Sequence, residues 1–116
     1  MAAQDGWQVV DLDHVITLMG DLSPDKQVAY REFLRVPSLS CGVYRLAAGS
    51  RDMQGPHDDD EVYYVLAGRA RVRVGGAERA VQAGSLLYVR AALDHAFFEI
   101  EEDMTLLVIF ANEARD

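Results

Sequence analysis

The amino-acid sequence predicts an all-β domain, built as an antiparallel barrel or sandwich of short strands. Runs rich in β-branched and aromatic residues, such as Val62 to Leu66, are separated by turn residues roughly every 6 to 12 positions. From Arg69 to Val74, arginines alternate with small or β-branched residues, which is the period of a strand with one face in water. Gly75-Gly76 then suits a two-residue hairpin turn.

The first third of the chain has a weaker pattern. Residues 7–12 are strand-like, and 13–19 fit a short helix in which Asp13 is a possible cap and Gly20 the stop. Residues 21–26 suit a loop. The apolar residues of 27–36 fit either a helix or a strand period, and a strand is favoured. Later strands are expected over residues 40–46, 61–66, 69–74, 77–81, 85–89, 95–100 and 104–110, with an irregular extended piece over 51–57 and turns at Ala67-Gly68 and at Glu101 to Asp103.

Length and charge limit the classes of function. A chain of 116 residues forms one domain, here expected as a barrel core over about 38–112 with an N-terminal extension over 1–37. The net charge of -8 argues against nucleic acid and membrane as partners, because both require basic patches. Cys41 is the one cysteine, and the N-terminus does not resemble a signal peptide, so a cytoplasmic location is expected.

Metal-ligand chemistry is concentrated between Pro56 and Gly68. On one straight strand, His57 and Glu61 would lie roughly 13 Å apart, too far to share an ion. The run Asp58 to Asp60 is prone to turns, so the chain is expected to bend there and let His57 and Glu61 converge.

Strand alternation predicts which side chains face the barrel interior. If Glu61 points inward, so does Tyr63, and if His95 points inward, so do Phe97 and Glu99. A few polar groups in an aromatic lining are typical of a ligand cavity.

These residues resemble the two motifs of the cupin superfamily, whose members are small jelly-roll barrels. Glu61 and Gly68 are separated by six residues as in the first motif, and His57 stands where its second histidine belongs. Gly84 and His95 keep the spacing of the second motif. The resemblance covers about residues 40–110 and departs from the family pattern at Gly55, Arg90, Ala92 and Glu99, which stand in place of a His, Pro, Gly and Asn.

The resemblance implies a reduced metal site made by His57, Glu61 and His95. Two imidazoles and a carboxylate suit Fe, Zn, Mn or Ni, and ligand identity does not choose among these divalent ions. Asp59 is a possible substitute ligand. The candidates for a catalytic base, or for a group that orients a ligating histidine, are Asp59, Tyr63 and Glu99.

Two classes of function follow. The first is a metal-dependent enzyme, an oxygenase or isomerase acting on a small metabolite. The second is a non-catalytic metabolite-binding or sensory barrel with a vestigial metal site. Small members of this family are commonly dimers, so a homodimer is expected, in which the N-terminal extension can wrap a neighbour.

Overall fold

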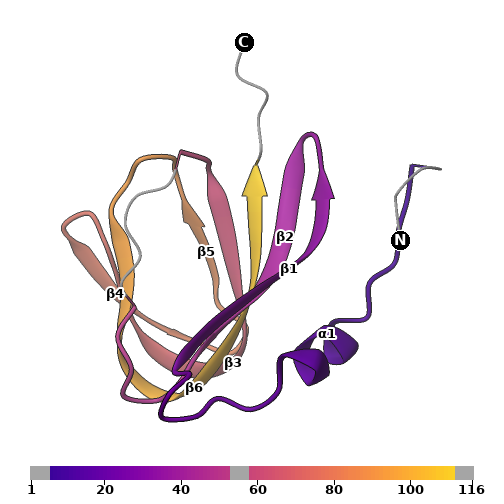
Figure 1. The fold of residues 1–116 in the computed structure, drawn as a ribbon. Helices are drawn as coiled ribbons and strands as arrows, with labels where there is room; N and C mark the ends of the chain where they lie inside the picture. The colour runs from indigo at the N-terminus through magenta and orange to yellow at the C-terminus, as the bar shows by residue number, and fades with distance from the viewer. Residues whose placement is uncertain (1–5, 53–57, 112–116) are drawn as a thin grey trace.

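The computed structural model describes residues 6–52 and 58–111, which form one antiparallel sheet bent into a barrel (Figure 1). One helix, α1 (Leu12–Met19), precedes the sheet. The strands are β1 (Val28–Val36), β2 (Leu39–Leu46), β3 (Glu61–Val74), β4 (Ala77–Gln82), β5 (Leu86–Val89) and β6 (His95–Ala111). Their order is β1-β2-β6-β3-β4, with β5 paired to β3. The predicted all-β antiparallel fold is therefore confirmed.

Two strands are longer than the sequence predicts. Ala67-Gly68 lies inside β3, and the acidic run Glu101 to Asp103 lies inside β6, so the turn predictions at both places were wrong. The β3–β6 pairing runs from Glu61 opposite Phe110 to Val74 opposite His95, with irregular register between Val65 and Arg71.

Gly68 explains why β3 bends without reversing. Its φ is +90°, a conformation that residues with a side chain rarely adopt, and a Cβ there would collide with the Asp103 carbonyl of β6. A bulge of this kind curves a strand while its partner continues beside it. The bend lets the two halves of β3 line opposite walls of one barrel.

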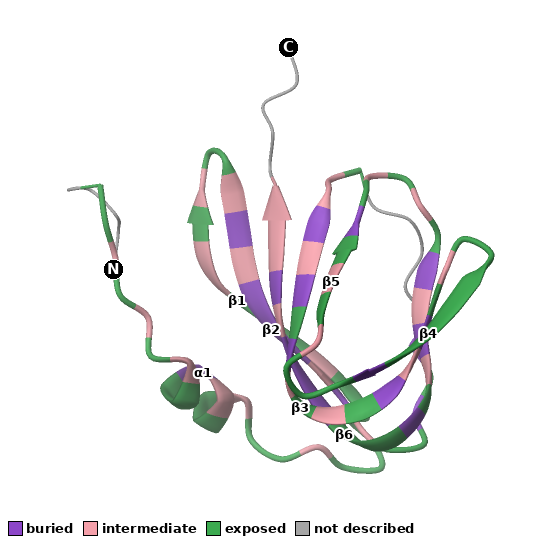
Figure 2. Ribbon diagram, turned by 180° about the vertical axis from the view of Figure 1, so that it is seen from behind, coloured by how far each residue is buried: buried purple, intermediate pink, exposed green. Residues whose placement is uncertain are grey.

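The interior of the barrel is filled mainly by alternate residues of β2, β3 and β6. This core holds Tyr63, Phe97, Leu46, Met104, Leu106, Val65, Val72, Val89 and Val108, each at most 2% exposed. Buried positions follow one another at every second residue along much of β2, β3 and β6 (Figure 2). The side chains of four residues therefore point into the barrel as predicted: Glu61, Tyr63, His95 and Phe97.

Helix α1 lies outside the barrel, against β1 (Figure 1). Its cap is Asp11, whose side chain accepts a hydrogen bond from the Asp13 backbone N–H, and not Asp13 as predicted. Gly20 ends the helix as expected, at φ +73°. Among residues 6–52 and 58–111, no helix has both the length and the apolar character needed to span a membrane.

Candidate functional site

Three polar side chains meet inside the barrel. Tyr63 Oη donates a hydrogen bond to Glu61 Oε1 at 2.8 Å and lies 3.0 Å from His95 Nε2. His95 Nε2 is itself 2.8 Å from Glu61 Oε1. Glu61, Tyr63 and His95 are 1%, 1% and 3% exposed, so the three groups interact away from water.

The curvature of the long hairpin brings these groups together. Glu61 opens β3 and His95 opens β6, and each lies at the opposite end of the β3–β6 ladder from the other. A flat ladder would hold them a strand length apart. Because β3 bends at Gly68, its first half faces the start of β6 across the barrel, and Glu61 meets His95 there.

The other ring nitrogen of His95 fixes the orientation of the imidazole. Nδ1 lies 3.1 Å from the Leu93 carbonyl oxygen, which can only accept, so Nδ1 carries a proton. Nε2 is then the nitrogen that faces Glu61 and Tyr63. This tautomer is the one that presents an Nε2 lone pair to a metal when the ring is neutral.

The environment of His95 favours its charged form. Burial lowers the pKa of the imidazole, but the hydrogen bonds to Glu61 and to the Leu93 carbonyl, and the negative charges of Glu61 and Asp52, outweigh burial and raise the pKa above its ordinary value. Glu61 therefore stabilises the protonated imidazole of His95 relative to the neutral ring.

Tyr63 is held by packing as well as by hydrogen bonds. Its ring meets Phe97 edge-to-face, with 5.2 Å between centroids and planes 86° apart. Of the three candidates for a base or orienting group, Tyr63 is the one that contacts Glu61 and His95. Its hydroxyl is in position to exchange protons with either group.

Asp52 is a buried group of the site that the sequence analysis missed. Its carboxylate accepts hydrogen bonds from Tyr44 Oη at 2.7 Å and from the Phe97 backbone N–H at 3.0 Å. The residue is 7% exposed, and its charge contributes to the raised pKa of His95. No motif or periodicity distinguishes Asp52 from a loop aspartate in the sequence, so only the tertiary structure reveals its place.

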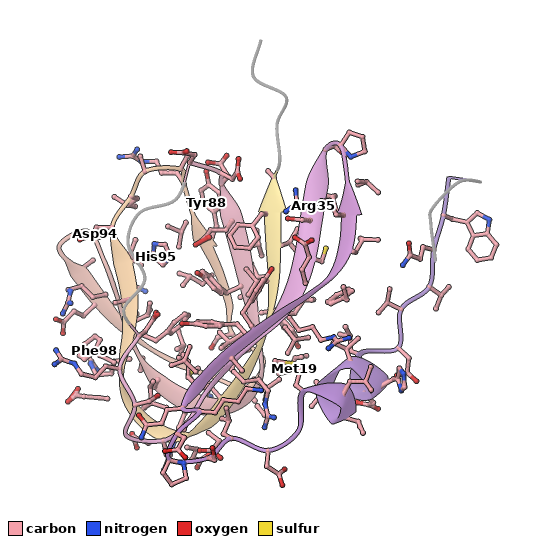
Figure 3. The ribbon with its side chains drawn as sticks, viewed as in Figure 1. Met19, Arg35, Tyr88, Asp94, His95 and Phe98 are labelled. Atoms are coloured by element: carbon pink, nitrogen blue, oxygen red, sulfur yellow. The ribbon has the colours of Figure 1, made fainter. Side chains whose placement is uncertain are left out.

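Among the described residues, one cavity has His95 in its wall and a smaller one lies near the start of β3. The larger, about 620 Å³, is lined by the loop that carries Asp52 and by the first part of β6, including His95 and Phe97. The second, about 370 Å³, lies between the β1–β2 hairpin and the start of β3, and Arg35 of β1 lies at this end of the barrel (Figure 3). Its wall includes Tyr30, Ser40 and Phe110. Both volumes suit a small molecule.

The remaining predicted site residues are His57, Asp59 and Glu99. His57 falls outside the described residues, as do Gly55 and Pro56. Asp59 is partly buried and lines the smaller cavity. Glu99 is exposed, not inward as predicted: its φ of +47° breaks the alternation of β6, Ile100 takes the buried position, and Glu99 Oε2 lies 3.9 Å from Arg71 Nε.

The described residues contain two of the three predicted metal ligands, Glu61 and His95. Within ranges 6–52 and 58–111, no group of three or more His, Cys, Asp or Glu side chains has the arrangement that would hold an ion. The predicted third ligand, His57, therefore stays a prediction.

Residues 42–110 match the model of the cupin domain family. This match covers more than half of the chain, and the protein belongs to the cupin family. The resemblance inferred from the two motifs is thus confirmed.

Among its relatives is an uncharacterized protein of Streptomyces coelicolor, SCO3923, which is 47% identical over 83 residues, 72% of this chain and 79% of the relative. Two solved structures are similar over most of both chains. TT1209 from Thermus thermophilus has a TM-score of 0.74 at 25% identity, over 90% and 97% of the two chains. KdgF from Halomonas sp. has a TM-score of 0.69 at 21% identity, over 83% and 86%.

The DMSP lyase DddQ from Ruegeria pomeroyi has a TM-score of 0.72 at 21% identity. The alignment covers 82% of this chain and 53% of the lyase, so the present chain spans about half the length of that enzyme. At these identities the structural similarities define the fold and leave the substrate open.

Proposed function

We propose that this cupin binds a divalent metal ion through His57, Glu61 and His95, and that it acts on a small metabolite held in the barrel. The observation that carries the proposal is the 2.8 Å approach of Glu61 Oε1 and His95 Nε2 from opposite ends of the β3–β6 ladder. Both side chains are nearly fully buried, in a fold whose interior otherwise consists mainly of apolar side chains.

The donor set fits a metal ion. A carboxylate oxygen and a histidine Nε2, with Nδ1 anchored on a carbonyl, are ligands that Fe, Zn, Mn and Ni all accept. A bound cation of this class would supply Lewis acidity, which polarises a carbonyl group or stabilises an enediolate. Oxygenase-like and isomerase-like chemistry are the two reaction classes that we propose for such a centre.

The chain's own residues have separate tasks in this proposal. Glu61 and His95 hold the ion. Tyr63 keeps Glu61 Oε1 in place through its hydroxyl and can take or give a proton at the adjacent substrate atom. Asp52 fixes the wall of the larger cavity by its bonds to Tyr44 and to the Phe97 backbone.

The close contact among Glu61, Tyr63 and His95 also favours a second function. Glu61, Tyr63 and His95 already lie within hydrogen-bond distance of one another, so these contacts can hold the three groups together without a cation. In this alternative the protein binds a metabolite in a flanking cavity without catalysis and without a resident metal.

Metal analysis of protein purified without an affinity tag distinguishes the two. The metal-binding function predicts close to one ion per chain, lost in His95→Ala and retained in the matched control His14→Ala, because His14 lies exposed on α1. If the protein takes up no ion and its thermal midpoint is unchanged by Fe, Zn, Mn and Ni, the metal-binding function is contradicted. The metabolite-binding alternative then remains.

A further inference from the structure

The smaller cavity, of about 370 Å³, is connected to the proposed metal centre by a row of side chains on one face of the sheet. Glu61 pairs with Phe110, Phe110 with Ser40, and Ser40 with Arg35, so the row runs from β3 through β6 and β2 to β1. Directly paired residues of antiparallel strands point to the same side. Neighbouring strands lie about 4.8 Å apart, which makes the row roughly 14 Å long. It begins inside the barrel at Glu61 and ends at the exposed Arg35.

Two aromatic rings form a corner of this cavity. Tyr30 of β1 and Phe110 of β6 both line it, with their ring planes 78° apart and their centroids separated by 6.4 Å. Gly42 makes room for this arrangement, because a Cβ at position 42 would collide with the ring and the hydroxyl of Tyr30. The faces of aromatic rings attract organic cations, and proteins bind ammonium groups between such rings.

The charged groups of the same cavity carry an excess of negative charge. Its described lining holds the carboxylates of Glu32, Asp58 and Asp59 and one guanidinium, that of Arg35, so three negative charges and one positive charge sum to -2. Burial, and then the charge of Glu32, raise the pKa of Tyr30 to about 12, so its phenol stays neutral at physiological pH. An anionic ligand would be repelled here, whereas a cation is attracted by the carboxylates and by the rings.

The larger cavity offers less to a cation. The Phe98 ring in its wall is already covered by a cation of the protein itself, since Arg73 Cζ lies 5.5 Å from the ring centroid. In its described lining, the two guanidinium groups of Arg51 and Arg73 face three carboxylates, so the excess of negative charge is smaller than in the other cavity. Rings and charge therefore select the smaller cavity as the site for a cationic group.

We propose that the smaller cavity binds the ammonium group of a small organic cation, and that the metabolite of this cupin directs its oxygen-bearing end toward Glu61 and His95. Tyr30 and Phe110 contact the ammonium group, and the carboxylates of the cavity balance its charge. This ligand class rests on the proposed function, which places a small metabolite in the barrel, although the ammonium site itself does not require the metal ion.

NMR titrations of the full-length, tag-free protein in metal-free buffer test the ligand class with three probes of similar shape. Choline carries the positive charge, 3,3-dimethylbutan-1-ol is its neutral carbon isostere, and 3,3-dimethylbutanoate carries a negative charge. Choline should bind with a dissociation constant at least about 10-fold lower than that of the alcohol, because only choline gains the attraction of the rings and the carboxylates. The carboxylate probe should bind more weakly than the alcohol.

Three substitutions separate the contribution of the rings from that of the charge. Tyr30→Leu removes one ring, Asp59→Asn removes one carboxylate, and Gly42→Ala keeps both but displaces the Tyr30 side chain. Each should reduce the preference for choline over the alcohol by at least about threefold. The matched controls are Tyr88→Leu and Asp25→Asn, which remove an exposed ring and an exposed carboxylate outside the cavity and should leave the preference unchanged.

Equal affinities for choline and the alcohol would overturn the proposal, as would a preference for choline that neither Tyr30→Leu nor Asp59→Asn reduces. If the protein prefers choline but takes up no metal ion, the ammonium site is supported and the metal-binding function fails. If it takes up the ion but does not prefer choline, the reverse holds. Circular dichroism melts verify that each variant is folded, and if Gly42→Ala does not fold, Tyr30→Leu, at an exposed side chain, decides the role of the ring.

Discussion

Glu61 Oε1 lies 2.8 Å from His95 Nε2, although the two residues stand at opposite ends of the β3–β6 ladder. This contact depends on the bend at Gly68, which turns the first half of β3 toward the start of β6. The fold and the polar centre are therefore linked through one residue whose backbone conformation is accessible mainly to glycine.

Removing the carboxylate of Glu61 should lower the pKa of His95, since the hydrogen bond to Glu61 is the largest cause that raises this pKa against burial, and the charge of Glu61 adds to it. We expect Glu61→Gln to shift the imidazole titration to lower pH in metal-free protein, as followed by NMR of the ring. Asp59→Asn, which removes a nearby carboxylate without contact to His95, should leave the titration in place. Equal curves for Glu61→Gln and wild type would contradict the pairing.

The same pair predicts how stability depends on pH. The folded-state pKa of His95 is raised above its ordinary value of 6.5, so the folded protein holds the proton more tightly than the unfolded chain. The stabilisation is fully present below pH 6.5 and is lost as the pH rises through the raised pKa. Denaturant unfolding at several pH values should show this loss in metal-free wild type and a smaller loss in Glu61→Gln.

Loss of the Tyr63 hydroxyl should destabilise the barrel without removing the metal ligands. Tyr63→Phe keeps the edge-to-face packing on Phe97 but deprives two buried groups of a hydrogen-bond partner, which costs about 1 to 3 kcal/mol. Tyr88→Phe, at an exposed position, should stay within about 0.5 kcal/mol of the wild type. Urea unfolding measures both, and equal stabilities would show that the hydroxyl contributes nothing to folding.

Gly68 and Gly84 allow the bend of β3 to be tested with a matched pair. Both have positive φ, +90° and +96°, but a Cβ at Gly84 meets nothing within 4 Å, whereas one at Gly68 collides with backbone atoms of Asp103 and Met104. Gly84→Ala should cost about 1 to 2 kcal/mol from the backbone alone. Gly68→Ala should cost about 1 to 3 kcal/mol more. A Gly68→Ala protein as stable as Gly84→Ala would show that the strand can bend without a glycine.

Tyr30 should ionise at higher pH than an ordinary tyrosine. Burial, and then the negative charge of Glu32, raise its pKa from 10.0 to about 12. Because the folded pKa is the higher one, the associated stabilisation is present below pH 10 and is lost as the pH rises toward 12. Ultraviolet titration of phenolate should show a late component whose amplitude decreases by one tyrosine in Tyr30→Phe, and an unchanged late amplitude in that variant would contradict the raised pKa of Tyr30.

Most of the strand pattern could be predicted from the sequence, because alternation and turn residues are local signals. The continuity of β3 and β6 could not: Ala67-Gly68 and the acidic run from Glu101 have the composition of turns, and only their pairing with each other, Arg69 opposite Glu102, keeps them in the sheet. Tertiary pairing overrides local propensity at these positions.

The candidate site was predictable to the extent that it rests on alternation and motif spacing. Glu61 and His95 follow from motif spacing, and Tyr63 follows from alternation with Glu61. Glu99 does not, because a positive φ at one residue shifts the register of everything that follows it. Asp52 was missed because a buried loop aspartate has no sequence signature, and its role appears only when Tyr44 and the Phe97 N–H are seen around it.

A crystal structure of the tag-free protein, with anomalous diffraction recorded at the absorption edge of the metal found by elemental analysis, tests the metal centre most directly. We predict one anomalous peak inside the barrel, about 2.0 to 2.2 Å from His95 Nε2 and from a carboxylate oxygen of Glu61, with the imidazole of His57 as the third ligand. A barrel without a peak, or a peak bound elsewhere while Glu61 and His95 remain paired, would contradict the proposed function.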